Sequence, residues 1–233
     1  MEPDPPVPER YLEEEVAQAY RRKYAVSFAR RLSNRRELSL VGRALARFDS
    51  TGRVLDCPCG AGRLVPTLLA HADHVTAVDA SPAMVAEARR ALEGRFEPGQ
   101  IEFAVANADR LPFEDDSFDV VVCHRLLHHV PGAEDRGRIL RELARVARQG
   151  IVLSFSDAST RKMRWLRLRG RAHRRMIWHP DQLRSEAAQA GLRLQPPVRR
   201  VSSLFSLVAI ARLRPTGEAG PRAERGRDQG RRA

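Results

Sequence analysis

The chain has 233 residues, which is enough for one α/β domain with a well-filled core but short for two full domains. Most of its formal net charge of +12 comes from residues 161–175, with eight Arg or Lys and no acid, and from residues 214–233, with six Arg and three acids. Residues 37–150 hold 14 basic and 17 acidic residues, so the excess positive charge belongs to appendages and argues against a nucleic-acid-binding core.

Several common classes of protein are disfavoured by simple patterns. No apolar run is long enough to predict a membrane span, and residues 1–9 lack the basic-then-apolar pattern of a secretion signal. Three cysteines cannot complete a disulfide framework. We therefore expect a cytoplasmic protein with reduced thiols.

The chain is predicted to be a single domain with a tail at each end. The first residues are rich in proline, and the last combine Gly, Pro and Arg, so both ends are expected to be disordered. The expected divisions are a disordered N-terminus (1–9), a domain over 10–213 made of N-terminal helices (10–50), a cofactor-binding half (51–155) and a substrate-side region (156–213), and a disordered basic tail (214–233).

Apolar spacing predicts a helix from about residue 10, with Tyr11, Tyr20 and Tyr24 on one face, and a second over 36–48. From residue 53, short apolar runs alternate with helical stretches, which is typical of parallel strands joined by crossover helices. Two late strands, linked by Pro196-Pro197, are expected to pair antiparallel. We therefore expect a doubly wound, Rossmann-like α/β sheet, mostly parallel with an antiparallel C-terminal strand, under an N-terminal helical cap. The predicted strands are 53–57, 74–78, 101–104, 118–123, 151–155, 192–194 and 203–213, and the later helices are 62–70, 82–92, 134–147 and 182–190.

The strongest local pattern is VLDCPCGAGRL at residues 54–64, where an apolar strand runs through a Gly-containing turn into a helix. This arrangement lets a ligand approach backbone amides at a helix N-terminus, and Gly60 and Gly62 remove side chains there. An ordinary strand-to-helix turn is the alternative interpretation of this segment alone.

The second pattern is an acid, Asp79, at the end of the next apolar strand, 23 residues after Asp56. A carboxylate at this place is suited to accept the two hydroxyls of a ribose. It could instead cap a helix, but Ser81 and Pro82 already supply an N-cap and a first-turn proline. Asp79 is thus expected to be free for a ligand.

Together with residues 107–113 (NADRLPF) and 116–122 (DSFDVVV), these segments make the chain resemble the class I S-adenosylmethionine (SAM) dependent methyltransferases. The similarity is to the small-molecule enzymes of the quinone-biosynthesis type and covers about residues 11–152. It implies SAM as cofactor, and methyl transfer to oxygen, carbon or nitrogen of a small molecule with release of S-adenosylhomocysteine (SAH). It also implies that Asp56 lies at the methionine end of SAM, Asp79 at the ribose and Asp109 at the adenine. The full set of expected cofactor-binding residues is Asp56, Pro58, Gly60, Gly62, Asp79, Ala80, Met84, Ala108, Asp109 and His124.

One residue departs from the pattern of this family. Pro58 stands where the first of three alternating glycines is usual, and proline offers no amide hydrogen. The nearest rival class, a dinucleotide oxidoreductase, needs G-x-G-x-x-G, but Leu64 and Val65 follow Gly62 without a third glycine.

The residues after the fourth predicted strand are expected to face the transferred methyl group. His128 or His129 could remove a proton from the acceptor as a catalytic base, or only position it. His124 and His128 have the spacing of metal ligands, but no Cys or carboxylate cluster accompanies them, so we expect no metal. The expected substrate-side residues are Tyr20, Tyr24, Arg125, Trp165 and Trp178.

Residues 161–175 are predicted to form a basic amphipathic helix with Trp165 on its apolar stripe. It could attract an anionic substrate, rest peripherally on an acidic membrane surface, or be a solvated lid. The alternative function is a methyltransferase acting on RNA or protein, or a nucleic-acid-binding module that uses the SAM fold. Nucleic acid is disfavoured because no Asn-Pro-Pro-Tyr or Asp-Pro-Pro-Tyr motif follows the fourth strand.

Overall fold

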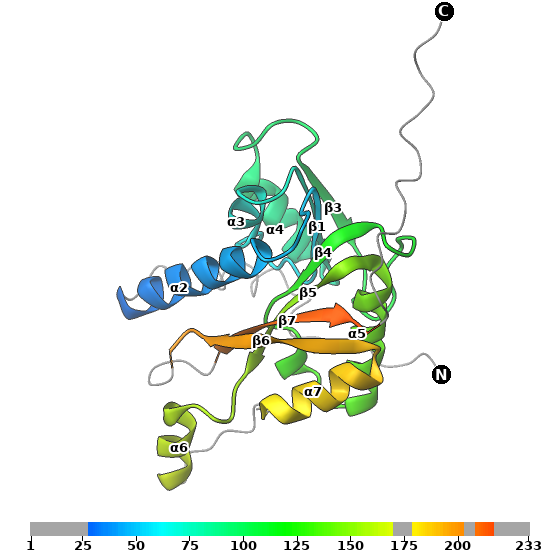
Figure 1. Ribbon diagram of the computed structural model, residues 1–233. Helices are drawn as coiled ribbons and strands as arrows, with labels where there is room; N and C mark the ends of the chain where they lie inside the picture. The colour runs from blue at the N-terminus through cyan, green and yellow to red at the C-terminus, as the bar shows by residue number, and fades with distance from the viewer. Residues whose placement is uncertain (1–27, 170–178, 203–207, 217–233) are drawn as a thin grey trace, which may run out of the picture.

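The computed structural model describes residues 28–169, 179–202 and 208–216 (Figure 1). The expectations for residues 1–9, for the first predicted helix, for Tyr20, Tyr24 and Trp178, and for the end of the tail lie outside the described residues.

A seven-stranded sheet forms the centre of the molecule, with strand order β3-β2-β1-β4-β5-β7-β6. The first five strands are parallel to one another, and β7 is antiparallel to both β5 and β6. The expected parallel sheet with an antiparallel C-terminal strand is confirmed. The strands are β1 (Arg53–Asp56), β2 (His74–Asp79), β3 (Ile101–Val105), β4 (Phe118–Cys123), β5 (Ala147–Ser156), β6 (Leu192–Arg200) and β7 (Val208–Pro215).

The expected position of the hairpin link is wrong. Pro196 and Pro197 lie inside β6, and β6 is an edge strand that runs on to Arg200. The register with β7 shifts between Gln195 and Arg199, so the two prolines occupy an irregularity in an edge strand. Proline is tolerated there because its missing N–H interrupts no regular ladder.

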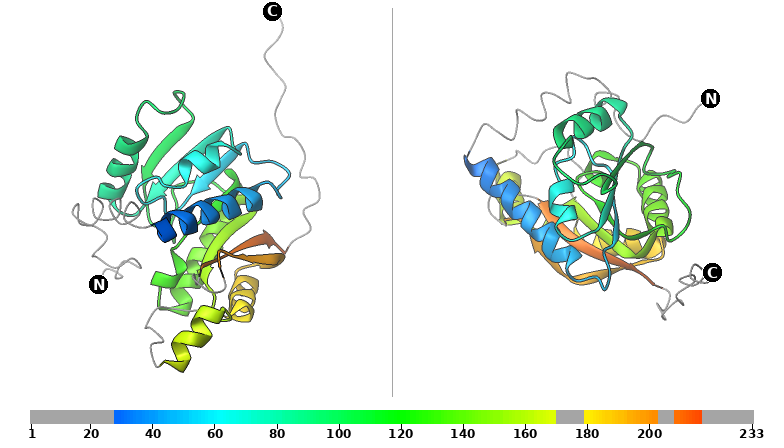
Figure 2. Two further views of the ribbon diagram at one scale, coloured as in Figure 1. Left: turned by 90° about the vertical axis from the view of Figure 1, so that its left-hand side faces the viewer. Right: turned by 90° about the horizontal axis from the view of Figure 1, so that it is seen from above.

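Helices cover both faces of the sheet in three layers (Figures 1 and 2). Helices α2, α3 and α4 share one apolar core with alternate strand residues such as Val120 and Val122, while α5 and α7 share the other with Val121 and Cys123. This division follows from the period of two in a strand, which points successive side chains to opposite faces. The helices are α2 (Phe28–Leu45), α3 (Val65–Leu69), α4 (Pro82–Leu92), the 3-10 helix η2 (Leu127–His129), α5 (Ala133–Val146), α6 (Arg161–Leu168) and α7 (Pro180–Gln189).

Because β1 to β5 are parallel, their carboxyl ends share one edge of the sheet, and we call it the carboxyl edge. Helix α2 runs between the two edges: Glu37 contacts residues after β1 and β4, whereas Asp49, just beyond the helix, bonds to Gln149 near the start of β5. Helix α6 leaves from the carboxyl end of β5. In the described part of the chain, no helix is long and apolar enough to cross a membrane.

Candidate active site

The turn after β1 is tied to the strands on both sides of it. The Cys57 N–H donates to the Val122 carbonyl of β4 at 3.0 Å, and the Cys59 N–H donates to the Val78 carbonyl of β2 at 2.7 Å. Pro58 sits between these two donors, so its lack of an amide hydrogen leaves this pairing complete. The turn is therefore fixed to the neighbouring strand tips in spite of the missing glycine.

Gly60 and Gly62 both have positive φ, +52° and +72°, but for different reasons. A Cβ on Gly60 would meet none of the described residues within 4 Å, so this glycine leaves space open to that part of the chain at the carboxyl edge. A Cβ on Gly62 would lie 2.8 Å from Leu92 Cδ1 and 3.2 Å from Ala88 Cβ of α4. Gly60 thus suits the expected approach of a ligand, whereas Gly62 lets α4 pack against the turn.

Asp79 joins the glycine turn to the start of α4. Its Oδ2 accepts the Gly60 N–H at 2.8 Å, and its Oδ1 accepts the Ser81 N–H at 3.0 Å. Ser81 itself caps α4, because its Oγ accepts the Met84 N–H. Burial raises the pKa of Asp79, and the backbone N–H donors oppose that rise. The carboxylate therefore lies beside Gly60, and the next expected cofactor residues along the chain are Ala80, which is half-buried, and Met84, which is buried in α4.

Asp56 ends β1 with its side chain completely buried. Neither carboxyl oxygen has a hydrogen-bond partner among the described residues. Burial raises the pKa of Asp56 to about 8; Arg63 opposes this rise and Asp79 adds to it. Burying a carboxyl group without partners is costly, so such a group in a folded protein indicates a functional position.

A second set of charges lies at the tip of β4, and we call it the Glu37 cluster: Glu37, Arg63, His124 and Arg125. Glu37 of α2 is 1% exposed and accepts from the Arg125 guanidinium at 2.7 and 2.9 Å. The Arg63 guanidinium lies 3.6 Å from the same carboxylate, and His124 Nε2 lies 3.5 Å from it. Burial, with the nearby cations Arg63 and Arg125, lowers the pKa of His124, so its ring is neutral.

Two residues of the Glu37 cluster were expected from the sequence to contact ligands: His124 the cofactor and Arg125 the substrate. His124 Nδ1 lies 3.2 Å from the Arg63 guanidinium, and the Arg125 guanidinium reaches inward to Glu37. The Arg125 N–H also donates to Ser154 Oγ of β5 at 2.7 Å. Glu37 was not predicted from the sequence, although its spacing gives a signal: it lies four residues before Val41 and eight before Leu45, on the buried face of the helix.

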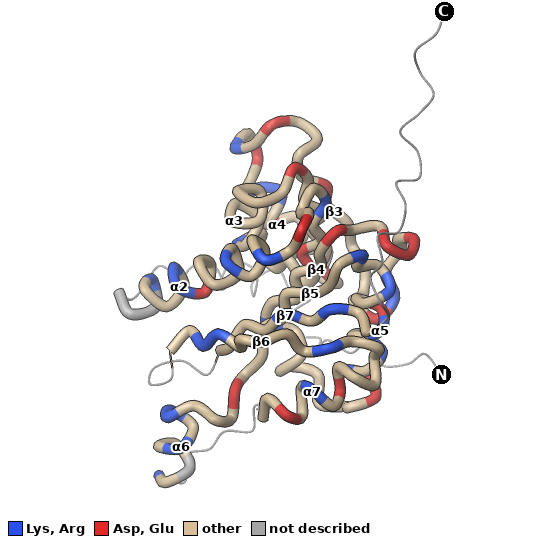
Figure 3. Tube along the Cα trace, in the orientation of Figure 1, with Lys and Arg blue, Asp and Glu red and all other residues tan. Residues whose placement is uncertain are grey.

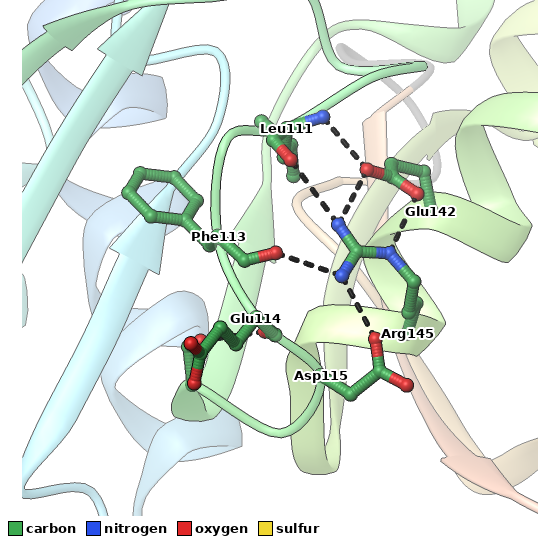
Figure 4. Close-up of polar contacts among 7 residues, drawn as sticks. Leu111, Phe113, Glu114, Asp115, Glu142 and Arg145 are labelled. Atoms are coloured by element: carbon green, nitrogen blue, oxygen red, sulfur yellow. Dashed lines mark hydrogen bonds and ion pairs between the residues drawn. The ribbon is translucent and has the colours of Figure 1, made fainter.

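The loop after β3 carries Ala108 and Asp109, both half-buried, and is held from α5 (Figure 4). Glu142 accepts the Leu111 N–H at 2.7 Å, and Arg145 donates to the Phe113 carbonyl, also at 2.7 Å. The two side chains also bond to each other, which lowers the pKa of Glu142 and raises that of Arg145. This pair fixes the loop only a few residues beyond Asp109.

His128 and His129 are half-buried in η2, with ring centroids 4.1 Å apart. The chain just after them is held by Arg136 of α5, which donates to the Val130 carbonyl at 3.0 Å and to the Pro131 carbonyl at 2.7 Å. The same guanidinium bonds to Glu186 of α7 at 2.9 and 2.7 Å. Among the described residues, His, Cys, Asp and Glu side chains form no group of three that could hold a metal.

Of the residues expected on the substrate side, Arg125 and Trp165 are among those that the structure describes. Trp165 of α6 is 48% exposed, and the Arg169 guanidinium lies 4.3 Å from the centre of its ring. Helix α6 begins after Thr160, whose Oγ accepts the Met163 N–H. The predicted basic helix is thus present over residues 161–168, and its predicted continuation from residue 170 lies outside the described residues.

Comparison with known proteins agrees with this arrangement. Residues 55–155 match a family model described as a methyltransferase domain. A ubiquinone biosynthesis O-methyltransferase of Xanthomonas oryzae pv. oryzae is 38% identical over 113 residues, which are 48% of this chain and 45% of that relative. The chain therefore matches about half the length of such curated relatives.

Two solved structures illustrate the fold. Magnesium protoporphyrin IX methyltransferase from Synechocystis PCC 6803, with bound SAH, superposes with a TM-score of 0.71 at 22% identity, covering 89% of this chain and 97% of that one. The [4+2]-cyclase SpnF superposes at 0.59 and 20% identity, covering 77% and 80%, so the fold by itself does not define the reaction. Residues 55–155 therefore resemble a methyltransferase domain, and the chain has the Rossmann-like fold that the sequence motifs predicted.

Proposed function

We propose that the protein transfers the methyl group of SAM to a small-molecule acceptor and releases SAH. The observation that carries this proposal is a set of three residues at the carboxyl edge: Asp56, a buried carboxyl group without partners among the described residues; Gly60, in an open backbone turn; and Asp79, a half-buried carboxylate. All three lie in the segment that matches the methyltransferase domain. The O-methyltransferase relative supports a small molecule as acceptor in preference to RNA or protein.

The residues present fit SAM by their chemistry. Asp79 would accept the ribose hydroxyls, and Asp56, fully buried at the end of β1, would lie beneath the methionine end. Ala108 and Asp109 would border the adenine on the loop that Glu142 and Arg145 hold. When bound, SAM supplies an activated methyl group on a sulfonium. Every other task falls to the protein, which must orient the two reactants, and orientation can provide much of the acceleration.

For the acceptor, we assign proton removal to His128 or His129. Both are half-buried after β4, beside the neutral His124, and Arg136 holds the chain that follows them. Positioning of the acceptor without proton transfer is the competing role. Replacing each histidine by Asn separates the two: loss of the acidic limb in the pH–rate profile identifies the base, and a change confined to KM identifies a positioning residue.

The second part of this proposal concerns the basic segment, residues 161–175. Exposed cations on α6, such as Arg161 and Arg164, would attract an anionic group, carried by the acceptor or by a lipid headgroup. The protein would then work in the cytoplasm, free or at the periphery of a membrane.

Calorimetry with SAH tests the cofactor assignment. Asp79→Asn should weaken SAH binding by roughly 1 to 3 kcal/mol, since a charged acceptor is lost from the ribose. Asp73→Asn, an exposed acid just before β2, is the matched control and should leave SAH affinity unchanged. Tighter binding of NADH than of SAH by the wild-type protein would contradict the proposal. Labelled SAM with a fractionated lysate then tests the acceptor class, which is contradicted if label enters RNA or protein instead of small molecules.

A further inference from the structure

The large apolar side chains that remain exposed are confined to one part of the described structure. They are Leu32 at 59%, Val105 at 51%, Trp165 at 48% and Leu168 at 87% exposed. Val105 is the last residue of β3, and Trp165 and Leu168 belong to the helix that follows β5. Leu32 lies five residues before Glu37, in the half of α2 that reaches the carboxyl edge. All four therefore lie at the carboxyl edge, where the candidate active site also lies.

Two of the elements at this edge, α2 and α6, combine apolar exposure with positive charge. Helix α6 contains no acid, and the single acid of α2 is Glu37, which is buried. Figure 3 shows the basic residues on both helices, and the left view of Figure 2 shows both helices on the side turned toward the viewer. We call these exposed side chains the basic apolar surface: Arg31, Leu32, Arg35 and Arg36 of α2, with Arg161, Arg164, Trp165, Leu168 and the adjoining Arg169.

We infer that the basic apolar surface docks the protein on an anionic lipid bilayer. Arginines on such a surface contact acidic headgroups, while Trp and Leu beside them enter the boundary between headgroups and acyl chains. Charge complementarity alone would also suit a nucleic acid. A bound nucleic acid would leave the side chains of Leu32 and the 87% exposed Leu168 in water, whereas a bilayer would cover them.

Docking in this way turns the candidate active site toward the bilayer. The turn at Gly60 and the carboxylate of Asp79 lie at the same edge as the basic apolar surface. An acceptor with a lipid-like tail would then reach the site without crossing bulk water. This consequence rests on the proposed methyl transfer, whereas the docking itself does not.

Flotation of the full chain with vesicles tests the docking. We expect binding to vesicles of phosphatidylcholine mixed with phosphatidylglycerol, no binding to phosphatidylcholine alone, and weaker binding as salt rises. Trp165→Ser with Leu168→Ser, Leu32→Ser alone, and Arg161→Gln with Arg164→Gln each remove one component. The two double variants should weaken binding about tenfold or more, and the single variant should weaken it by a smaller factor.

The matched control is Arg95→Gln with Arg193→Gln, which removes two exposed arginines near the amino ends of β3 and β6. This variant should bind anionic vesicles as the wild type does. If the control lost as much vesicle binding as the Arg161/Arg164 variant, net charge alone would explain the binding, and the assigned surface would be overturned. Binding to a single-stranded RNA oligonucleotide but not to vesicles, or binding to neither, would also overturn it.

SAH calorimetry on the Trp165/Leu168 variant keeps the two proposals separate, because unchanged SAH affinity with lost flotation supports docking. Absence of SAH binding in the wild type would contradict the methyltransferase proposal alone.

Discussion

The two sides of the candidate active site are held together in different ways. On the β2 side, Asp79 accepts backbone N–H groups from Gly60 and Ser81, so the contacts join residues close in sequence. On the β4 side, the Glu37 cluster joins side chains from three segments, and the Glu37–Arg125 bond spans 88 residues. A short motif can therefore reveal the β2 side, whereas the β4 side depends on where α2 packs. The site and its N-terminal helix are built as one unit, because the carboxylate that orders the β4 side belongs to α2.

Replacing Glu37, the centre of the Glu37 cluster, should lower the stability of the protein more than the other substitutions below. Glu37→Ala leaves the partly buried guanidinium groups of Arg63 and Arg125 without their shared carboxylate, and the free energy of unfolding should fall by about 4 kcal/mol. Urea unfolding measures this change. Glu93→Ala, at an exposed acid after α4, should change stability by less than about 0.5 kcal/mol. If both variants behave alike, the cluster does not hold α2 to the site.

Asp56 should make the stability of the protein depend on pH. Its pKa is raised from 3.8 to about 8 in the folded state, so the folded protein binds the proton more tightly than the unfolded chain does. The stability linked to this proton is fully present below pH 4 and is lost as pH rises toward 8. Asp56→Asn, which cannot ionise, should therefore be more stable than the wild type by on the order of 3 kcal/mol at pH 6 and hardly more stable near pH 4.

Urea unfolding of Asp56→Asn and wild type across this pH range measures the difference. Asp73→Asn, at an exposed acid, should show no such growth of stability with pH. A constant difference between the Asp56 variant and the wild type would contradict the buried, partnerless placement of Asp56.

The two roles found for the glycines lead to a smaller, paired prediction. Gly62→Ala places a methyl group 2.8 Å from Leu92 at φ +72°, so stability should fall by about 2 kcal/mol from strain and overpacking together. Gly94 has a similar φ of +65°, and none of the described residues lies within 4 Å of its Cβ position. Gly94→Ala should therefore lose only about 1 kcal/mol in thermal unfolding. Equal losses in the two variants would contradict a packing role for Gly62.

The smallest expected effect is at the partly exposed pair in Figure 4. Arg145→Gln removes the bonds to Glu142, Asp115 and the Phe113 carbonyl, and should cost about 1 kcal/mol of stability because solvent screens the pair. Arg138→Gln breaks an exposed pair with Asp135 on the same helix and should cost close to nothing. A comparable loss in both would mean that Arg145 does not hold the loop after β3.

Most of the sheet followed from local patterns. The strands at 74–78 and 118–123 and the helix at 82–92 were predicted within a residue of β2, β4 and α4, because apolar periodicity and the Ser81-Pro82 cap are properties of neighbouring residues. The link expected at Pro196-Pro197 was wrong, since an edge strand with an irregular register accepts two prolines. Asp56 and Asp79 were correctly expected at strand ends, for the same local reason.

Burial and long-range pairing could be decided only by the folded chain. Sequence spacing marked Asp56 as a site residue but could not show that its oxygens lack partners among the described residues, because this depends on everything packed around the end of β1. Two glycines two residues apart look equivalent in the motif, yet one faces open space and the other faces Leu92 of α4. Glu37 looked like an ordinary helix residue until packing brought it to Arg63 and Arg125. Periodicity, caps and turns are local properties that a sequence carries directly, whereas desolvation and charge pairing arise only when distant segments meet.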